Sequence, residues 1–117
     1  MNTYILNDKH EAVPCEDMIA WGKFFSLPDR FVKQETVRER RWYGIFRLAS
    51  KPVSISTVFL GMDHNFDSGA PILFETMVFG GRLNGFQQRY STWREAVWGH
   101  EEVKKMVLRR RNNALDM

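Results

Sequence analysis

Cysteine is almost absent from this chain of 117 residues, in which Cys15 is the only one. A single cysteine excludes an intrachain disulfide and offers no cluster of thiolates for zinc. No apolar run approaches the roughly 20 residues that a membrane-spanning helix needs. The first residues also lack the basic and then apolar pattern of a signal peptide. We therefore expect a cytoplasmic protein that has no membrane partner.

Several sequence motifs of enzymes are missing as well. There is no P-loop, no G-x-G-x-x-G and no G-x-S-x-G in the chain, which argues against P-loop nucleotide hydrolysis, Rossmann cofactor binding and a nucleophile elbow. Low-complexity tracts and internal repeats are absent too. We expect one globular domain over residues 1–111, a tail over residues 112–117, no cofactor and no enzymatic activity.

Charge is present in modest excess, with a formal net charge of +3. Its distribution is more informative than its size, because arginines cluster before the middle of the chain and again near its end. Such clusters are compatible with a nucleic-acid partner, although most charge runs of this size are simply solvated surface. The first cluster contains Arg38, Arg40, Arg41 and Arg47, and the second contains Arg109, Arg110 and Arg111.

Two apolar runs rich in β-branched and aromatic residues occupy the middle of the chain, at residues 53–62 and 72–79. Both have the length and composition of strands. Residues 63–71 between them carry polar turn formers, a glycine and a proline, which is typical of a loop. The pattern predicts a long β-hairpin at the centre of a sheet. Because neither run alternates cleanly, we expect both of its faces to be at least partly covered.

Weaker patterns flank this hairpin on its N-terminal side. Residues 4–6 and 11–13 enclose a turn-like tetrapeptide and predict a small edge hairpin. An apolar face formed by Met18, Trp21 and Phe25 predicts a helix over residues 16–25. Alternation within residues 37–48 favours a strand, with an arginine-rich helix as the alternative.

The last part of the chain carries the clearest helix signal. Thr92 and Glu95 have the spacing of a capping box, and we expect the helix to cover residues 92–111. Gly99 lies beside its apolar stripe and implies a close approach to the sheet or to an aromatic ring. A short strand or an extended connector over residues 86–90 precedes the helix. The stripe consists of Trp93, Ala96, His100, Val103 and Val107.

Together these elements predict an α+β fold. We expect an antiparallel sheet of three to five strands built on the central hairpin, with the N-terminal helix and the long C-terminal helix packed on it.

Three blocks of sequence carry a resemblance. They are S-T-V-F-L-G-M-D-H-N-F at residues 56–66, L-F-E-T-M-V-F-G-G at residues 73–81, and R-Y-S-T-W at residues 89–93 with G-H at residues 99–100. Over about residues 56–107 the chain resembles a widespread family of short bacteriophage and prophage proteins of uncharacterised activity. The resemblance implies a phage origin and a setting in the host cytoplasm. It brings no activity and no catalytic residues with it.

The loop after residue 62 presents oxygen ligands on alternate residues, Asp63, Asn65 and Asp67. Calcium loops have this pattern, but the glycine comes one position late and strands rather than helices flank the loop. Asx side chains that close a turn on their own backbone explain the same residues. We expect no metal here, and these three residues are the candidates if there is one.

Four residues form the catalytic alternative: Asp63, His64, Glu75 and His100. Carboxylates and imidazoles are the usual acid–base groups and ligands of divalent metals, so a metal-dependent hydrolase is one hypothesis. Glu75 shares a strand face with apolar residues and needs a partner if it is buried. Arg89, His100 or Tyr90 can supply that partner, and a structural ion pair is favoured over a ligand-facing role.

The function that we expect first is that of a small non-enzymatic phage accessory protein that binds a host macromolecule. A host protein is the favoured partner, modulation of host defence or metabolism is one such role, and homodimerisation through an aromatic patch fits the same features. A nucleotide-binding or nucleic-acid-binding protein is the alternative. Trp98 falls off the apolar stripe of its helix, so we expect it to be exposed, as a binding hot spot would be. The binding candidates are Arg38, Arg40, Arg41, Trp42, Arg47, Trp98, Arg109 and Arg110.

Overall fold

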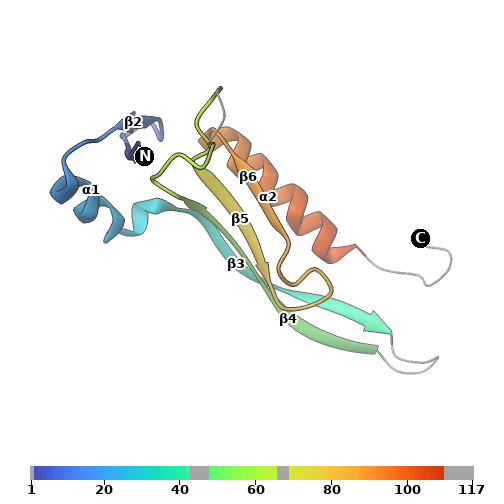
Figure 1. Cartoon of the computed structure of the whole chain (residues 1–117). Helices are drawn as coiled ribbons and strands as arrows, with labels where there is room; N and C mark the ends of the chain where they lie inside the picture. Colours follow the sequence, from blue (N-terminus) through green and yellow to red (C-terminus); the bar gives the residue numbers. More distant parts are fainter. Residues whose placement is uncertain (1, 43–47, 66–68, 110–117) are drawn as a thin grey trace.

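The computed structural model describes residues 2–42, 48–65 and 69–109. It has the predicted α+β fold, with a four-stranded antiparallel sheet in the order β3-β4-β5-β6, a separate two-stranded sheet and two α-helices (Figure 1). The elements are β1 (Tyr4–Leu6), β2 (Ala12–Pro14), α1 (Met18–Phe25), the short 3-10 helix η1 (Pro28–Arg30), β3 (Phe31–Trp42), β4 (Leu48–Phe59), β5 (Phe74–Phe79), β6 (Gln87–Tyr90) and α2 (Trp93–Leu108).

The predicted central hairpin is confirmed as β4 and β5, the two inner strands of the sheet. They pair antiparallel from Ser54 opposite Phe79 to Phe59 opposite Phe74. Strand β4 begins at Leu48, five residues before the apolar run, because it also pairs along its whole length with β3. The short strand predicted over residues 86–90 is present as β6, which begins at Gln87 because Phe86 still belongs to the preceding turn.

Among the helices that the structure describes, α2 covers one face of this sheet and none covers the other. Val53, Ile55 and Thr57 of β4 are fully buried, whereas Ser54 between them is exposed and Ser56 is half-buried. The expectation that both faces are at least partly covered is therefore met only in part: on the second face Ser54 and Phe79 are exposed, whereas Ser56 and Met77 are half-buried and Glu75 is buried. Alternate residues of a strand point to opposite faces of the sheet. In β4 the buried residues therefore point to the face that α2 covers, and the serines between them point to the uncovered side. We call the uncovered side, which carries Ser54 and Ser56, the open face.

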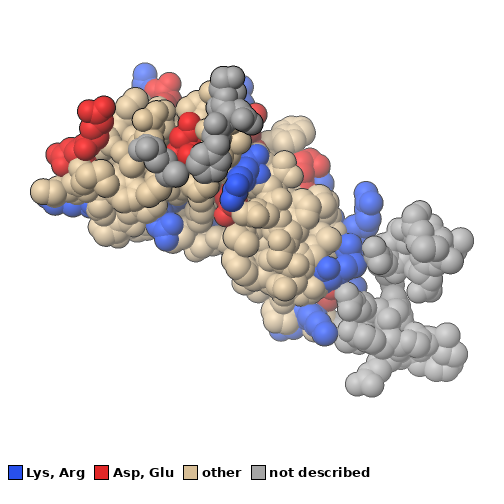
Figure 2. Space-filling model, viewed as in Figure 1, with Lys and Arg blue, Asp and Glu red and all other residues tan. Residues whose placement is uncertain are grey.

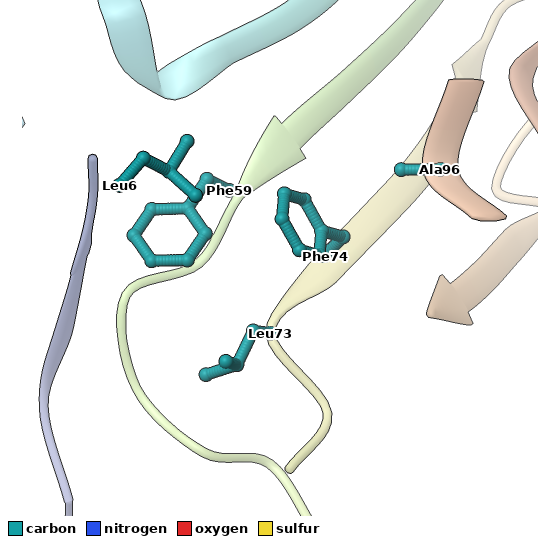
Figure 3. Close-up of a cluster of buried hydrophobic side chains, with 5 residues drawn as sticks. All are labelled: Leu6, Phe59, Leu73, Phe74 and Ala96. Atoms are coloured by element: carbon teal, nitrogen blue, oxygen red, sulfur yellow. The ribbon is translucent and has the colours of Figure 1, made fainter. Parts of the chain in front are cut away.

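Two clusters of buried side chains form the core. The first joins the N-terminal hairpin to the sheet and the start of α2, and Figure 3 shows its members Leu6, Phe59, Leu73, Phe74 and Ala96. The second lies between the sheet and the second half of α2 and contains Val53, Ile55, Val78, Val103 and Val107. Helix α2 therefore packs along its whole length on the covered face of the sheet, which lies opposite the open face.

Helix α2 forms as the sequence predicts. Thr92 accepts a hydrogen bond from the Glu95 amide at 3.1 Å, and the Glu95 carboxylate accepts one from the Thr92 amide at 3.1 Å. The buried stripe contains Ala96, Gly99, His100, Val103 and Val107, while Trp93 is half-buried. The helix ends at Leu108 rather than at residue 111. The expected close approach at Gly99 is to an aromatic ring, because a Cβ atom there would lie 2.2 Å from the ring of Tyr90.

The N-terminal region forms both predicted elements in altered form. Strands β1 and β2 make a sheet of their own instead of adding to the edge of the main sheet. In α1, which begins after the N-cap Asp17, Met18 is 58% exposed, so the predicted apolar face is wrong at that residue. The other two residues of that face do pack, since Trp21 Nε1 donates a hydrogen bond to the Gly61 carbonyl oxygen at 3.2 Å and the Phe25 ring lies 6.4 Å from the Phe59 ring. Phe24 adds a contact, because its ring meets the Phe59 ring edge-on at a centroid distance of 5.8 Å.

Strands β3 and β4 continue beyond the rest of the sheet. Their pairing runs to Trp42 opposite Leu48, whereas β5 pairs with β4 only from Ser54 onward. Residues 38–42 and 48–52 therefore form a two-stranded projection, which we call the arm (Figure 1). The strand predicted within residues 37–48 is confirmed as far as Trp42, and residues 43–47 lie outside the described part of the chain.

Candidate functional site

The arm presents two arginines on one side of β3. Arg38 and Arg40 are exposed, and alternation along the strand places them on the open face together with Thr36. Arg38 is within 3.5 Å of the Ser50 carbonyl oxygen, at the limit for a hydrogen bond. Within residues 2–42, 48–65 and 69–109, neither guanidinium has an acidic partner in an ion pair. Both are thus available to an anion in solution.

A buried carboxylate anchors the base of the arm. Glu39, between the two arginines, points to the opposite face, and its two carboxylate oxygens each lie 3.1 Å from the Arg82 amide nitrogen. Gly81 has a φ of +71°, and a Cβ atom there would lie 3.0 Å from the same carboxylate. The turn between β5 and β6 is therefore bound tightly to β3. Sequence reasoning missed Glu39, because its setting among arginines is equally typical of a surface ion pair.

Further cations lie at the same end of the molecule. Lys105 and Arg109 are exposed near the end of α2, and the Arg82 guanidinium donates a hydrogen bond to the Met106 carbonyl oxygen at 2.7 Å. Cations favour the C-terminal end of a helix because it carries partial negative charge. In Figure 2 blue side chains gather beside the arm and the end of α2, and red side chains are prominent at the end that holds α1. On the face that Figure 2 shows, cations thus gather at the end that holds the arm.

Glu75 lies on the open face and is buried there. Its carboxylate accepts hydrogen bonds from Arg89 Nε at 2.9 Å and from the side-chain amide of Gln87. Arg89 is one of the three partners that the sequence suggested. Because the Glu75 carboxylate is paired, it contributes little free negative charge to this face of the sheet.

His100 lies on the other side of the sheet, fully buried under α2. Its Nδ1 is 2.6 Å from Thr57 Oγ1, and its Nε2 is 2.7 Å from a carboxylate oxygen of Glu35. Lys104 donates to the second oxygen of that carboxylate at 3.1 Å. A hydroxyl, an imidazole and a carboxylate in this order resemble a hydrolase triad. Thr57 is fully buried, however, so a substrate has no access to its hydroxyl and the network acts to hold α2 on the sheet.

The charge state of Glu35 follows from the same contacts. Burial of the carboxyl works to raise its pKa, but hydrogen bonds from His100 and Lys104 and the charge of Lys33 outweigh burial. The pKa of Glu35 therefore lies below its ordinary value. Sequence reasoning missed this residue, since nothing in the pattern of β3 marks which of its carboxylates meets a helix 65 residues further on.

The four residues of the catalytic alternative are not brought together. Glu75 and His100 lie on opposite faces of the sheet. Asp63 Oδ1 instead accepts hydrogen bonds from the amides of Asn65 at 2.8 Å and Ile72 at 2.9 Å, which closes the loop on its own backbone. His64 Nδ1 lies 2.7 Å from the Met62 carbonyl oxygen. The described residues contain no group of three or more metal-ligating side chains, and Asp67 lies outside them.

A concavity of about 670 Å³ lies between the N-terminal hairpin and the start of α2. Leu73 and Phe74 are among the apolar residues that line it, and the rings of His10 and Trp93 stack beside it with centroids 3.9 Å apart. His10 has a φ of +61°, which is uncommon for a residue with a side chain. The sequence held no signal for this cleft, because its walls come from three distant segments.

The remaining binding candidates divide into those that the structure describes and those that it does not. Trp98 is 70% exposed, as predicted, and Arg109 is exposed as well. Arg41 and Trp42 belong to β3, but their side chains lie outside the description, as do Arg47 and Arg110 altogether. Cys15 is a buried free cysteine.

The fold and the surface thus define an α+β protein with one uncovered sheet face and a basic two-stranded arm. No helix among the described residues is long and apolar enough to cross a membrane. Comparison of the chain with family models, with curated proteins and with solved structures produced no match.

Proposed function

We propose that this protein is a non-enzymatic nucleic-acid-binding protein whose arm contacts the phosphate backbone. Binding of a host macromolecule is the function that the sequence suggested first, and nucleic acid is the macromolecule that this surface supports best. The observation that carries the proposal is the arm itself, on which Arg38 and Arg40 are exposed side by side without acidic partners among the described residues.

The shape of the arm suits this role. The major groove of B-DNA is about 12 Å wide and admits a two-stranded β-ribbon. Arg38 and Arg40 stand two residues apart on an extended strand, a separation of about 7 Å, so each guanidinium can reach a different phosphate. The planar guanidinium binds phosphate oxygens in a bidentate manner, which an ammonium group cannot do.

The cations of α2 extend the basic surface. Lys105 and Arg109 lie at the same end of the molecule as the arm, and the field of several cations on one side attracts a polyanion more strongly than the net charge suggests. On the resemblance to phage proteins, we also propose that the polymer is encountered in the cytoplasm of a bacterial host.

Fluorescence anisotropy with a labelled oligonucleotide tests the proposal. Binding should weaken steeply between about 50 and 200 mM salt, because each contacted phosphate releases counterions. The double variant Arg38→Glu/Arg40→Glu should weaken binding by about tenfold or more and lower the salt slope by about two. The matched control is Lys9→Glu/Lys23→Glu, which changes the net charge equally at the opposite end. Equal losses in both double variants, or none in either, would contradict a role for the arm.

Trp98 supports a second candidate, the binding of a host protein. An indole that is 70% exposed on a helix is the kind of side chain that dominates protein interfaces. Trp98→Ala should then abolish capture of a discrete host protein that resists high salt, and it should leave nucleic-acid affinity unchanged. If the same proteins are captured by both forms, this candidate fails.

A further inference from the structure

A groove of about 620 Å³ crosses the open face from β3 to β5. Phe31 and Phe79 lie among its lining residues, on strands at its two sides. The Phe79 side chain is 51% exposed. A large aromatic ring so exposed in a strand is unusual, because removal of its apolar surface from water is favourable.

Between the two rings the lining consists mainly of polar side chains, with Val58 among them. Gln34 donates a hydrogen bond to Ser56 Oγ at 2.8 Å, and the hydroxyls of Thr36 and Ser54 lie 3.4 Å apart. These contacts occupy only part of the hydrogen-bonding capacity of an amide and three hydroxyls. The remaining donors and acceptors face the groove and suit the polar edges of nucleobases, which present both kinds of group.

The charges beside the groove complement an anionic chain. The Arg30 guanidinium stacks over the Phe31 ring at 4.3 Å from its centroid. Further along β3, on the same face, come Arg38 and Arg40 of the arm. Among the described strand residues, the carboxylate that shares this face is Glu75, and it is buried against Arg89. Glu35 also lines the groove, but its carboxylate is bound by His100 and Lys104. The groove and the arm thus form one continuous surface with little free negative charge.

We propose that this groove binds the unpaired bases of single-stranded nucleic acid, with a base stacked on Phe79 while the arm holds the backbone. An exposed aromatic ring can stack on a base of a single strand, whereas the faces of duplex bases are already occupied by their neighbours. The inference rests on the proposed nucleic-acid binding and adds its substrate class. A second copy of this chain, packed face to face through Phe79, is the competing occupant.

The experiment compares a labelled single strand with a duplex of the same sequence, using the intact protein and the variant Phe79→Ala. The intact protein should bind the single strand about tenfold or more tightly than the duplex. Loss of one stacked base, worth about 1–3 kcal/mol, should weaken single-strand binding of Phe79→Ala by about 5- to 150-fold. Duplex binding should not change, because it depends on the arm. Val97→Ala, which truncates an exposed apolar residue of α2, is the control and should change neither affinity.

Four outcomes are informative. Preferential loss of single-strand binding in Phe79→Ala supports the groove. Equal affinities for both nucleic acids in both proteins overturn the groove but leave the arm as a duplex-binding element. If the intact protein is a dimer by light scattering, Phe79→Ala is a monomer and nucleic-acid affinity is unaffected, then the open face is a self-association surface and the inference is wrong. Absence of binding to either nucleic acid would instead refute the proposed function itself.

Discussion

The hydroxyl oxygen of Thr57 lies 2.6 Å from Nδ1 of His100, and both side chains are fully buried between the sheet and α2. The Glu35 carboxylate can only accept, so the imidazole Nε2 carries a hydrogen. With Nδ1 as the acceptor, Thr57 donates to it. Thr57 in turn accepts from Thr76 at 2.5 Å, and Thr76 accepts from the Tyr90 hydroxyl at 3.1 Å. One directed chain of hydrogen bonds thus links β6, β5, β4 and α2.

Removal of the central hydroxyl should destabilise the protein. Thr57→Val keeps the shape of the side chain but leaves Nδ1 of His100 and the hydroxyl hydrogen of Thr76 each without a partner in a buried place, which costs about 1–3 kcal/mol. Urea unfolding followed by circular dichroism measures the loss. The control Ser54→Val lies on the same strand but on the open face, where we expect a change within about 0.5 kcal/mol. Similar losses in both variants would show that the chain of hydrogen bonds carries no special share of stability.

Replacement by alanine should change the stability of the protein in opposite directions at two helical glycines. Gly99→Ala places a Cβ atom 2.2 Å from the Tyr90 ring, and overpacking of this kind costs about 1–3 kcal/mol. Gly22→Ala meets no atom within 4 Å in α1 and should gain about 1 kcal/mol through helix propensity. The midpoint of thermal unfolding should therefore fall in the first variant and rise in the second. A rise in both would mean that the Tyr90 ring moves aside without loss.

Acid should lower the free energy of unfolding, because Glu35 becomes protonated. Its pKa in the folded protein lies below the ordinary value of 4.5, since hydrogen bonds from His100 and Lys104 and the charge of Lys33 outweigh the effect of burial. The unfolded chain therefore binds the proton more tightly, so this stabilisation is complete above pH 4.5 and is lost as the pH falls through the folded pKa. The free energy of unfolding, measured from neutral pH to about pH 3, should decrease across that window.

The variant Glu35→Gln isolates this contribution, because it keeps an oxygen acceptor for His100 but has no carboxyl to titrate. Its stability should be lower near neutral pH and should depend less on pH below 4.5. Other carboxylates such as Glu101, whose pKa is lowered by its hydrogen bond from Lys33, still titrate in both proteins. Identical pH dependence in the two proteins would place the acid sensitivity elsewhere.

Elements with a strong local signal could be predicted from the sequence. The spacing of Thr92 and Glu95 marked the start of α2, and the 3-4 repeat of apolar residues identified its buried side correctly. Composition identified β4 and β5 as the centre of the sheet. Both signals depend on neighbours within a few residues, so they persist whatever the rest of the chain does.

Pairings between distant segments could not be predicted. Glu35 and His100 are 65 residues apart, and nothing near either residue specifies the other. The candidate site likewise depends on pairing between distant segments. The arginines of the arm were visible as a cluster, but their projection beyond the sheet depends on β5 ending opposite Ser54.

The sequence by itself determined the class of the fold, the two inner strands, the capped helix and the exposure of Trp98. Only the tertiary structure decided that one sheet face has no described helix on it and that Glu75 and His100 lie on opposite sides of the sheet. The physical reason is that α2 buries a single stripe and can therefore cover only one face. Which face it covers depends on packing between segments far apart in the chain, which local periodicity does not encode.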